Sequence, residues 1–124
     1  MFKKASNPGA WPTELKFIEK KASLKVSFDD GFSGDIPYEL LRVESPSAET
    51  KGHGGENPPP PAGKRHVAVT NASPVGRYAV RISFTDGHDT GLYTWPYLYD
   101  LAKDKSARMK SYQERLKDAG LSRD

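Results

Sequence analysis

Residues 74 to 101, PVGRYAVRISFTDGHDTGLYTWPYLYDL, decide the fold of this chain. Every second residue from Tyr78 to Phe84 is apolar, which is the period of a half-buried strand. Asp86-Gly87 comes next, and an Asp-Gly pair between two apolar runs favours a tight turn because glycine adopts positive φ without a steric penalty. A second strand is predicted from residue 90 to residue 95. Pro96 then suits the first turn of a helix. The residues that we expect to share one face of the first strand are Tyr78, Val80, Ile82 and Phe84.

The segment before this stretch repeats the same chemistry. Residues 14 to 18 and 23 to 28 are predicted to form a strand pair, with Leu24, Val26 and Phe28 facing inward. Asp30-Gly31 predicts another turn, residues 32 to 36 a short return strand, and residues 37 to 41 one turn of helix. Ser27-Phe28-x-Asp30-Gly31 matches Ser83-Phe84-x-Asp86-Gly87. The match has two interpretations, a two-fold internal repeat or two ordinary hairpins that share a common turn.

Residues 44 to 64 differ in composition from the rest of the chain. Serine, glycine, glutamate and proline dominate, and four prolines run from Pro58 to Pro61, so we expect a mobile loop with a polyproline II segment. His53 and His66 flank the prolines, and with Glu49 or Glu56 they could form a cation site; solvated loop histidines explain the same residues. Strand character resumes from residue 65 to residue 72.

The remaining sequence is helical after Pro96. The apolar stripe comprises Leu98, Leu101, Ala102, Lys105, Met109, Tyr112, Leu116 and Ala119, and Gly120 is a suitable C-terminal stop. A single helix of this length would exceed what so small a domain needs, so we expect its second half to project, fray or self-associate. The expected organisation is a flexible lead-in (1–13), a domain (14–102) and a helical extension with a frayed C-terminus (103–124).

Composition limits the possible functions. The 124 residues suit one α+β domain, a small and mainly antiparallel sheet built from hairpins with a C-terminal helix and a long Pro/Gly-rich loop. The absence of cysteine excludes disulfides, thiolate metal sites and cysteine nucleophiles. No apolar run suits a signal peptide or a membrane span, so we expect a cytoplasmic protein. Residues 1 to 102 hold 12 basic and 12 acidic residues, whereas residues 103 to 124 hold 7 and 4, so the net charge of +3 lies in the tail.

Several motifs together resemble the gamma-butyrobetaine hydroxylase-like N-terminal domain, a family long catalogued as a domain of unknown function. They are Leu41-Arg42, Ser45-Pro46-Ser47, Pro74-Val75-Gly76, and the string from Phe84 through Asp86-Gly87-His88-Asp89-Thr90-Gly91 to Tyr93 and Trp95. The resemblance implies a small β-rich domain that precedes an iron- and 2-oxoglutarate-dependent oxygenase and helps it to dimerise, stands alone in bacteria, or follows an iron–sulfur carrier ATPase.

The resemblance also implies a structural zinc in the hydroxylases, held by three cysteines and one histidine. Carried over residue by residue, those positions fall on Ser45, Ser47, Thr50 and His88. Neutral hydroxyls are poor zinc ligands beside thiolates, and one imidazole does not hold the ion alone. We therefore expect that this chain has lost the zinc and uses no cofactor.

No nucleophile elbow, phosphate-binding loop or iron-oxygenase triad occurs in the sequence, so we expect no enzyme activity. The leading hypothesis is a non-catalytic binding module that recognises a protein partner, an iron–sulfur carrier ATPase or an oxygenase by resemblance, or forms a homodimer. Its predicted interaction surface comprises Arg42, Asp86, His88, Asp89 and Thr90. Two alternatives stay open, namely iron or zinc binding through His88 and loop residues, and weak nucleic-acid binding by the basic helix. The interleaved acidic residues of that helix make a nucleic-acid role unlikely.

Overall fold

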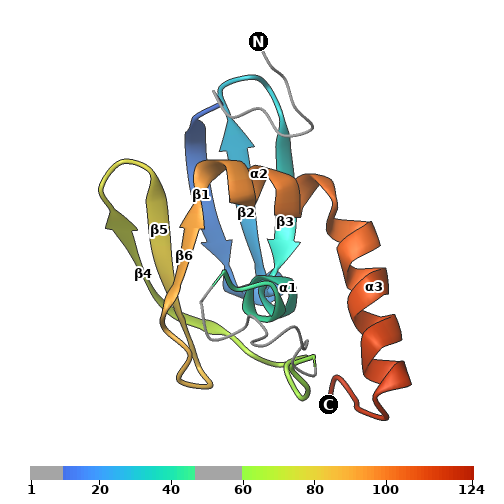
Figure 1. Ribbon diagram of the computed structural model, residues 1–124. Coiled ribbons are helices and arrows are strands. Elements are labelled where there is room, and N and C mark those ends of the chain that lie inside the picture. The colour runs from blue at the N-terminus through green and yellow to red at the C-terminus, as the bar shows by residue number, and fades with distance from the viewer. Residues whose placement is uncertain (1–9, 47–59) are drawn as a thin grey trace, which may run out of the picture.

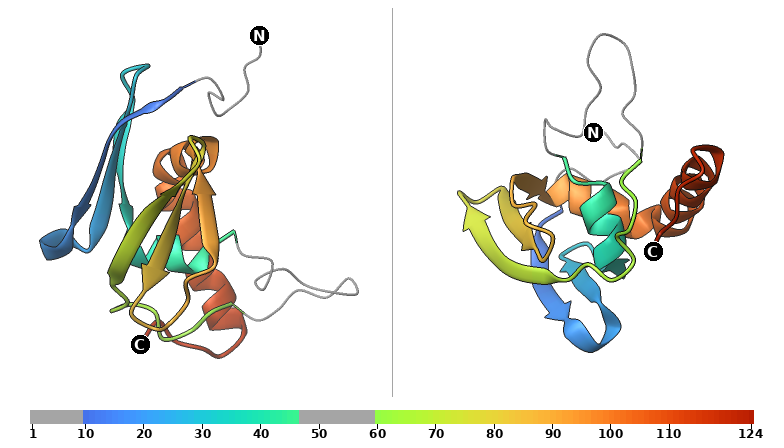
Figure 2. Two further views of the ribbon diagram at one scale, coloured as in Figure 1. Left: turned by 90° about the vertical axis from the view of Figure 1, so that its left-hand side faces the viewer. Right: turned by 90° about the horizontal axis from the view of Figure 1, so that it is seen from below.

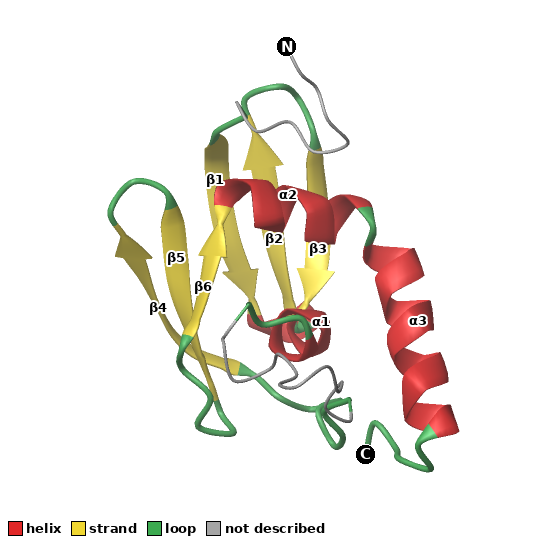
Figure 3. Cartoon of the chain, in the orientation of Figure 1, coloured by secondary structure: helices red, strands yellow, loops and turns green. Residues whose placement is uncertain are grey.

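The fold is α+β and contains two small antiparallel sheets (Figure 1, Figure 3). A computed structural model describes residues 10–46 and 60–124. The first sheet is followed by one helix and the second sheet by two. In chain order the elements are β1 (Pro12–Ile18), a 3-10 turn (Glu19–Lys21), β2 (Ser23–Phe28), β3 (Ser33–Pro37), α1 (Tyr38–Val43), β4 (Val69–Val75), β5 (Ala79–Phe84), β6 (Gly91–Thr94), α2 (Trp95–Lys103) and α3 (Lys105–Asp118).

Each sheet buries its central strand. In β2 every second residue is fully or almost fully buried, as the alternation predicted. The helices cover one face of the first sheet: α2 packs against both β2 and β3, and α1 packs against β3. Apolar side chains from both sheets and all three helices thus form a single cluster. Its fully buried members include Leu24, Val26, Ile36, Leu40, Leu41, Ile82, Tyr93, Leu98, Leu101 and Tyr112.

The two sheets have the same topology and register. Their strand orders are β1-β2-β3 and β4-β5-β6, and all pairs are antiparallel. Phe28 pairs with Pro12, and in the second sheet Phe84 pairs with Val69. In both sheets the register then shifts by one residue, which places a bulge at Thr13 in β1 and at Thr70 in β4.

The turns that follow β2 and β5 also match bond for bond. Gly31 N donates to Phe28 O at 3.1 Å, and Gly87 N donates to Phe84 O at 3.0 Å. Both glycines have positive φ, 93° and 90°. The two turns lie at opposite ends of the molecule in Figure 1. The internal repeat is therefore confirmed, and the alternative of two unrelated hairpins is wrong.

A close approach of helix to strand occurs once in each repeat. Gly34 of β3 lies under α2, where an added Cβ would be 3.3 Å from the Ala102 Cβ. Gly91 of β6 packs against Ser45, two residues beyond the end of α1, where an added Cβ would be 2.4 Å from the Ser45 Oγ. α2 thus covers a strand of the first repeat, the segment after α1 covers a strand of the second, and the two repeats share one core (Figure 2).

Three details differ from the sequence prediction. Tyr78 was expected on the inward face, but it precedes β5 and is 55% exposed. β4 begins at Val69 rather than at residue 65, because residues 65–68 form a turn and an extended lead-in. The helix after Pro96 is broken at Asp104, where the backbone leaves helical geometry. The break turns α3 away from the direction of α2 (Figure 1).

The C-terminal residues return to the body instead of projecting. Tyr112 and Leu116 are buried, and Gly120 (φ 69°) ends α3 as predicted, with Leu121 N donating to Leu116 O. The chain then runs beside residues 63–65, through hydrogen bonds from Gly63 N to Ser122 O and from Arg65 N to Arg123 O. Burial of the α3 stripe explains why this segment does not extend into solvent.

The Arg123 guanidinium donates two hydrogen bonds, of 2.9 and 2.7 Å, to the Glu39 carboxylate, which is only 5% exposed. The pair connects the C-terminal segment to α1. It also supplies the counter-charge that a buried carboxylate needs.

The predicted mobile loop 44–64 and the flexible lead-in lie largely outside the described residues, as do Ser47, Glu49, Thr50, His53 and Glu56. Within the described parts, no helix is both long and apolar enough to cross a membrane.

Candidate functional site

The turn between β5 and β6 is built around the carboxylate of Asp86. One of its oxygens accepts the backbone N–H of His88 at 3.1 Å, which closes the turn. The other accepts both the Arg42 Nε at 2.7 Å and the Lys64 Nζ at 2.6 Å. These two cations come from α1 and from the segment before β4, so Asp86 joins three separate parts of the chain. The carboxylate side chain is 21% exposed.

Electrostatics keep Asp86 ionised. Partial burial opposes the charge, but the hydrogen bonds from Lys64, the His88 backbone and Arg42 outweigh that effect and lower its pKa to about 2. Near neutral pH the site is thus one carboxylate shared by two cations.

His88 is hydrogen-bonded beside the same turn. Its Nε2 lies 2.9 Å from the Ser45 Oγ, and Ser45 is only 3% exposed. The hydroxyl lies directly above Gly91, where no side chain larger than hydrogen fits. Ser45 follows α1, whose end is fixed by the Tyr97 hydroxyl, a donor to the Glu44 carbonyl at 2.5 Å. Burial raises the pKa of Tyr97 to about 12, so this phenol remains a donor.

The histidine and serine do not form a usable nucleophile and base. A serine nucleophile must be reachable by substrate, whereas Ser45 is buried and its hydroxyl packs against Gly91. The hydrogen bond between Ser45 and His88 holds the turn against the segment that follows α1.

The structure brings together three of the five predicted surface residues, Arg42, Asp86 and His88. Asp89 and Thr90 lie on the same turn, and both are exposed. Lys64 was missed, because it was assigned to the loop. One sequence signal could have predicted the contact of Lys64 with Asp86. Lys64 is a basic residue at the end of the loop, just before the strands that lead to the acidic turn.

A comparison with protein families identifies the fold. The family described as gamma-butyrobetaine hydroxylase-like, N-terminal, matches residues 15–99. The chain belongs to this family. The sequence resemblance drawn from the turn and its flanking strands is thus confirmed. Among functionally curated proteins, no significant match is found.

Solved structures of similar proteins agree with this assignment. Two NMR solution structures share 41% and 42% identity with the chain, with TM-scores of 0.79 and 0.76. They cover 93% and 99% of the chain, which in turn covers 90% of each. A crystal structure of a protein of unknown function from Acidithiobacillus ferrooxidans, of the DUF971 family, shares 36% identity with a TM-score of 0.62. It covers 78% of the chain, which covers 98% of it.

The residues at the family's zinc positions do not fit that ion. Ser45 and His88 are adjacent, so the geometry agrees with the carry-over for two of the four positions. However, three of the four would be neutral hydroxyls, and Ser47 and Thr50 lie outside the described residues. Residues 10–46 and 60–124 also contain no cluster of three or more His, Asp or Glu suited to a metal. In this chain a serine–histidine hydrogen bond connects the positions that zinc would join.

Proposed function

We propose that this protein is a non-catalytic accessory module that binds a protein partner through the turn from Asp86 to Thr90 together with Arg42. The observation that carries the proposal is the convergence of Arg42 and Lys64 on one oxygen of Asp86. This contact fixes a turn on which Asp89 and Thr90 are both exposed. Binding surfaces are often loops held by a rigid scaffold.

A fixed turn favours recognition for an energetic reason. Association requires ordering of the interface, at about 0.5–1.5 kcal/mol for each side chain or loop residue that must be immobilised. Here the backbone is already ordered by Gly87, by the His88 N–H bond to Asp86 and by the serine–histidine bond. A partner would therefore meet a surface whose geometry is set before contact.

The partner classes follow from the family. The resemblance implies that such domains precede 2-oxoglutarate oxygenases, where they help to build the dimer, or follow iron–sulfur carrier ATPases. We propose a protein of one of these two classes as the first partner to test, with a second copy of this chain as the alternative.

The test is chemical-shift mapping of the ¹⁵N-labelled chain with a candidate carrier ATPase or oxygenase from the same cell. We expect perturbations centred on residues 86–90 and at least about tenfold weaker binding by the variant Asp89→Ala/Thr90→Ala. The matched control is Ser106→Ala/Asp118→Ala, which removes one hydroxyl and one carboxylate from exposed positions of α3. Perturbations elsewhere, or equal weakening in both variants, would count against the proposal.

A further inference from the structure

The turn between β2 and β3 is the structural counterpart of the Asp86 turn, because the two repeats share register. One oxygen of Asp30 accepts the backbone N–H of Phe32 at 2.9 Å, as Asp86 accepts that of His88. Two turns of the same backbone conformation therefore place a carboxylate, Asp30 or Asp86, at each end of the molecule. What surrounds each carboxylate differs.

The opposite helix donates to each carboxylate from an equivalent position. Arg42 of α1 donates to Asp86, and Tyr99 of α2 donates to Asp30 at 2.6 Å. At the turn between β5 and β6 the helix donor is the cation Arg42, and Lys64 supplies a second cation to Asp86. At the first turn the donor is a neutral phenol, whose hydrogen bond to Asp30 raises its pKa to about 12. The helix donor to Asp30 is thus uncharged, whereas the helix donor to Asp86 is a cation.

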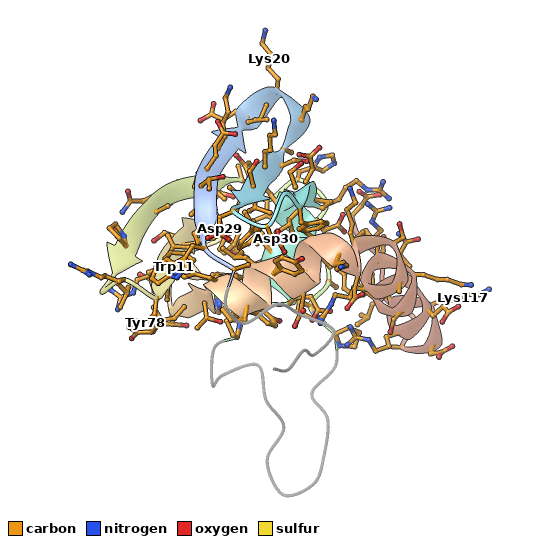
Figure 4. The ribbon with its side chains drawn as sticks, turned by 90° about the horizontal axis from the view of Figure 1, so that it is seen from above. Trp11, Lys20, Asp29, Asp30, Tyr78 and Lys117 are labelled. Carbon is orange, nitrogen blue, oxygen red and sulfur yellow. The ribbon has the colours of Figure 1, made fainter. Side chains whose placement is uncertain are left out.

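A second carboxylate and a tryptophan stand next to Asp30. Asp29 occupies the position of Thr85, and Trp11 occupies that of Ala68. The Asp29 Oδ1 accepts the Trp11 N–H at 3.1 Å, and the Trp11 carbonyl accepts the Asp29 N–H at 2.8 Å. These two bonds fix the backbone of Trp11, while its side chain remains 51% exposed. Figure 4 shows Trp11, Asp29 and Asp30 at the same end of the molecule.

This end of the molecule already holds one cation. The Lys103 ammonium lies 5.5 Å from the Phe32 ring centre and 5.4 Å from that of Tyr99. The Tyr99 ring packs against Phe28 and Phe32, with centroid distances of 4.9 and 4.7 Å. The aromatic surface therefore has the quadrupole and the spacing that attract positive charge.

We propose that Trp11, Asp29, Asp30 and Tyr99 form a second binding surface that takes an arginine-bearing segment of a partner protein. The guanidinium pairs with the Asp29 carboxylate and stacks on the exposed Trp11 ring. Arginine fits better than lysine because its planar guanidinium forms directed hydrogen bonds to a carboxylate and stacks on aromatic faces. The counterpart turn shows the same chemistry within the chain, since Arg42 donates its Nε to Asp86.

The probe is the peptide acetyl-Gly-Arg-Gly-Arg-Gly-amide, added to the full ¹⁵N-labelled chain. We expect shifts at the Trp11 indole N–H and at the amides of residues 29–32. The variant Asp29→Asn keeps the oxygen that accepts the Trp11 N–H but loses the charge, so binding weakens at least about tenfold. Asp118→Asn, which removes one carboxylate from the exposed surface of α3, leaves the affinity unchanged.

Three results would overturn the proposal. The first is equal affinity for a peptide in which citrulline, which has the shape of arginine without its charge, replaces both arginines. The second is equal affinity of Asp29→Asn and Asp118→Asn, or shifts centred on residues 86–90. The third is a severalfold gain in affinity on changing Lys3 and Lys4 to alanine, because the occupant would then be this chain's own N-terminal segment. A well-dispersed spectrum of each variant establishes that folding is retained.

Discussion

Two fully or almost fully buried tyrosines, Tyr38 and Tyr93, differ in one hydrogen bond. The Tyr93 hydroxyl donates to the Leu41 carbonyl at 2.6 Å, whereas the Tyr38 hydroxyl is buried without a hydrogen-bond partner in the part of the chain that the structure describes. Tyr93→Phe leaves a carbonyl unsatisfied and should lower the free energy of unfolding by about 1–2 kcal/mol. Tyr38→Phe removes an unpaired polar atom, so it should be neutral or stabilising by up to about 1 kcal/mol.

Urea unfolding at 25 °C measures both tyrosine variants, and each serves as the control of the other because the atom removed is the same. A larger loss of stability in Tyr38→Phe than in Tyr93→Phe would contradict the assigned hydrogen bonding.

The low pKa of Asp86 makes folding stability depend on pH. The pKa is about 2 in the folded chain, compared with 3.8 ordinarily, so the unfolded chain binds the proton more tightly. The stabilisation is complete above the unfolded pKa and is lost as pH falls through about 4 to 2. Because the side chain is partly exposed, we expect about 1 kcal/mol from this group. The loss should be smaller in Asp86→Asn, as measured by urea unfolding at pH 5, 4, 3 and 2.

At the level of single residues, the sequence predicted the turn well and its supports poorly. Asp86, Gly87 and His88 could be placed because a local pattern specifies them. Lys64 could not, because its contact with Asp86 depends on where two distant segments meet. Tyr78 was misplaced for a related reason: alternation extends the strand pattern by one residue, and only the position of the preceding turn shows where pairing starts.

Glycines in the two edge strands β3 and β6 allow the helices to approach. An alanine at Gly91 would place its Cβ 2.4 Å from the Ser45 Oγ, so a side chain or the strand must move, and we expect a loss of about 2–3 kcal/mol. At Gly34 the nearest atom is 3.3 Å away, and the expected loss is about 1 kcal/mol. Chemical unfolding ranks the two variants. Ser45→Gly should recover part of the loss in Gly91→Ala and none in Gly34→Ala, and equal recovery would refute the proposed contact.

The C-terminal segment contributes stability through Arg123. Replacing it with alanine leaves the buried Glu39 carboxylate without its bidentate partner, so we expect a loss of about 3 kcal/mol in the free energy of unfolding. Arg115→Ala, which removes an exposed arginine of α3, should change stability by less than about 0.5 kcal/mol. The double variant Arg123→Leu/Glu39→Leu tests the cause. It should recover much of the loss if the unpaired charge is responsible.

The elements themselves were largely predictable, and their ends and directions were not. Strand periodicity, Asp-Gly turns and Pro96 placed most strands and the start of α2. The break at Asp104 carries only a weak local signal: aspartate favours the N-cap position that Asp104 occupies before α3, but its side chain makes no cap hydrogen bond and no glycine or proline follows. It arises from packing: Leu101 and Ala102 face the first sheet, while Tyr112 and Leu116 must also be buried.

The molecule as a whole is one cooperative unit formed from two repeats. α2 packs on β2 and β3 of the first repeat, and Ser45 of the first repeat packs on Gly91 of the second, so the core is shared between the halves. We expect residues 1–52 and 53–124, produced separately, to be largely unfolded by circular dichroism and to form the native spectrum when mixed. A folded isolated half would contradict the shared core. The uncut chain is the control.

From the sequence, the two-fold repeat could be suspected but not decided. The matching letters amount to little more than Ser-Phe-x-Asp-Gly, and such strings recur by chance. The decisive features are the matching bulges at Thr13 and Thr70 and the paired backbone hydrogen bonds of the two turns. The amino-acid types at these positions do not reveal the bulges or the backbone hydrogen bonds, because both depend on how strands align across a sheet.

The helix exchange between the repeats has a consequence for the proline-rich connection. Two separate half-length chains could build the same interior as a dimer, in which case the covalent connection between the halves acts as a tether. A tether raises the effective concentration of one half near the other, and its closure entropy changes only slowly with length. The composition of this linker is therefore free to drift, while a single-residue insertion in either bulged strand would shift an entire sheet out of register.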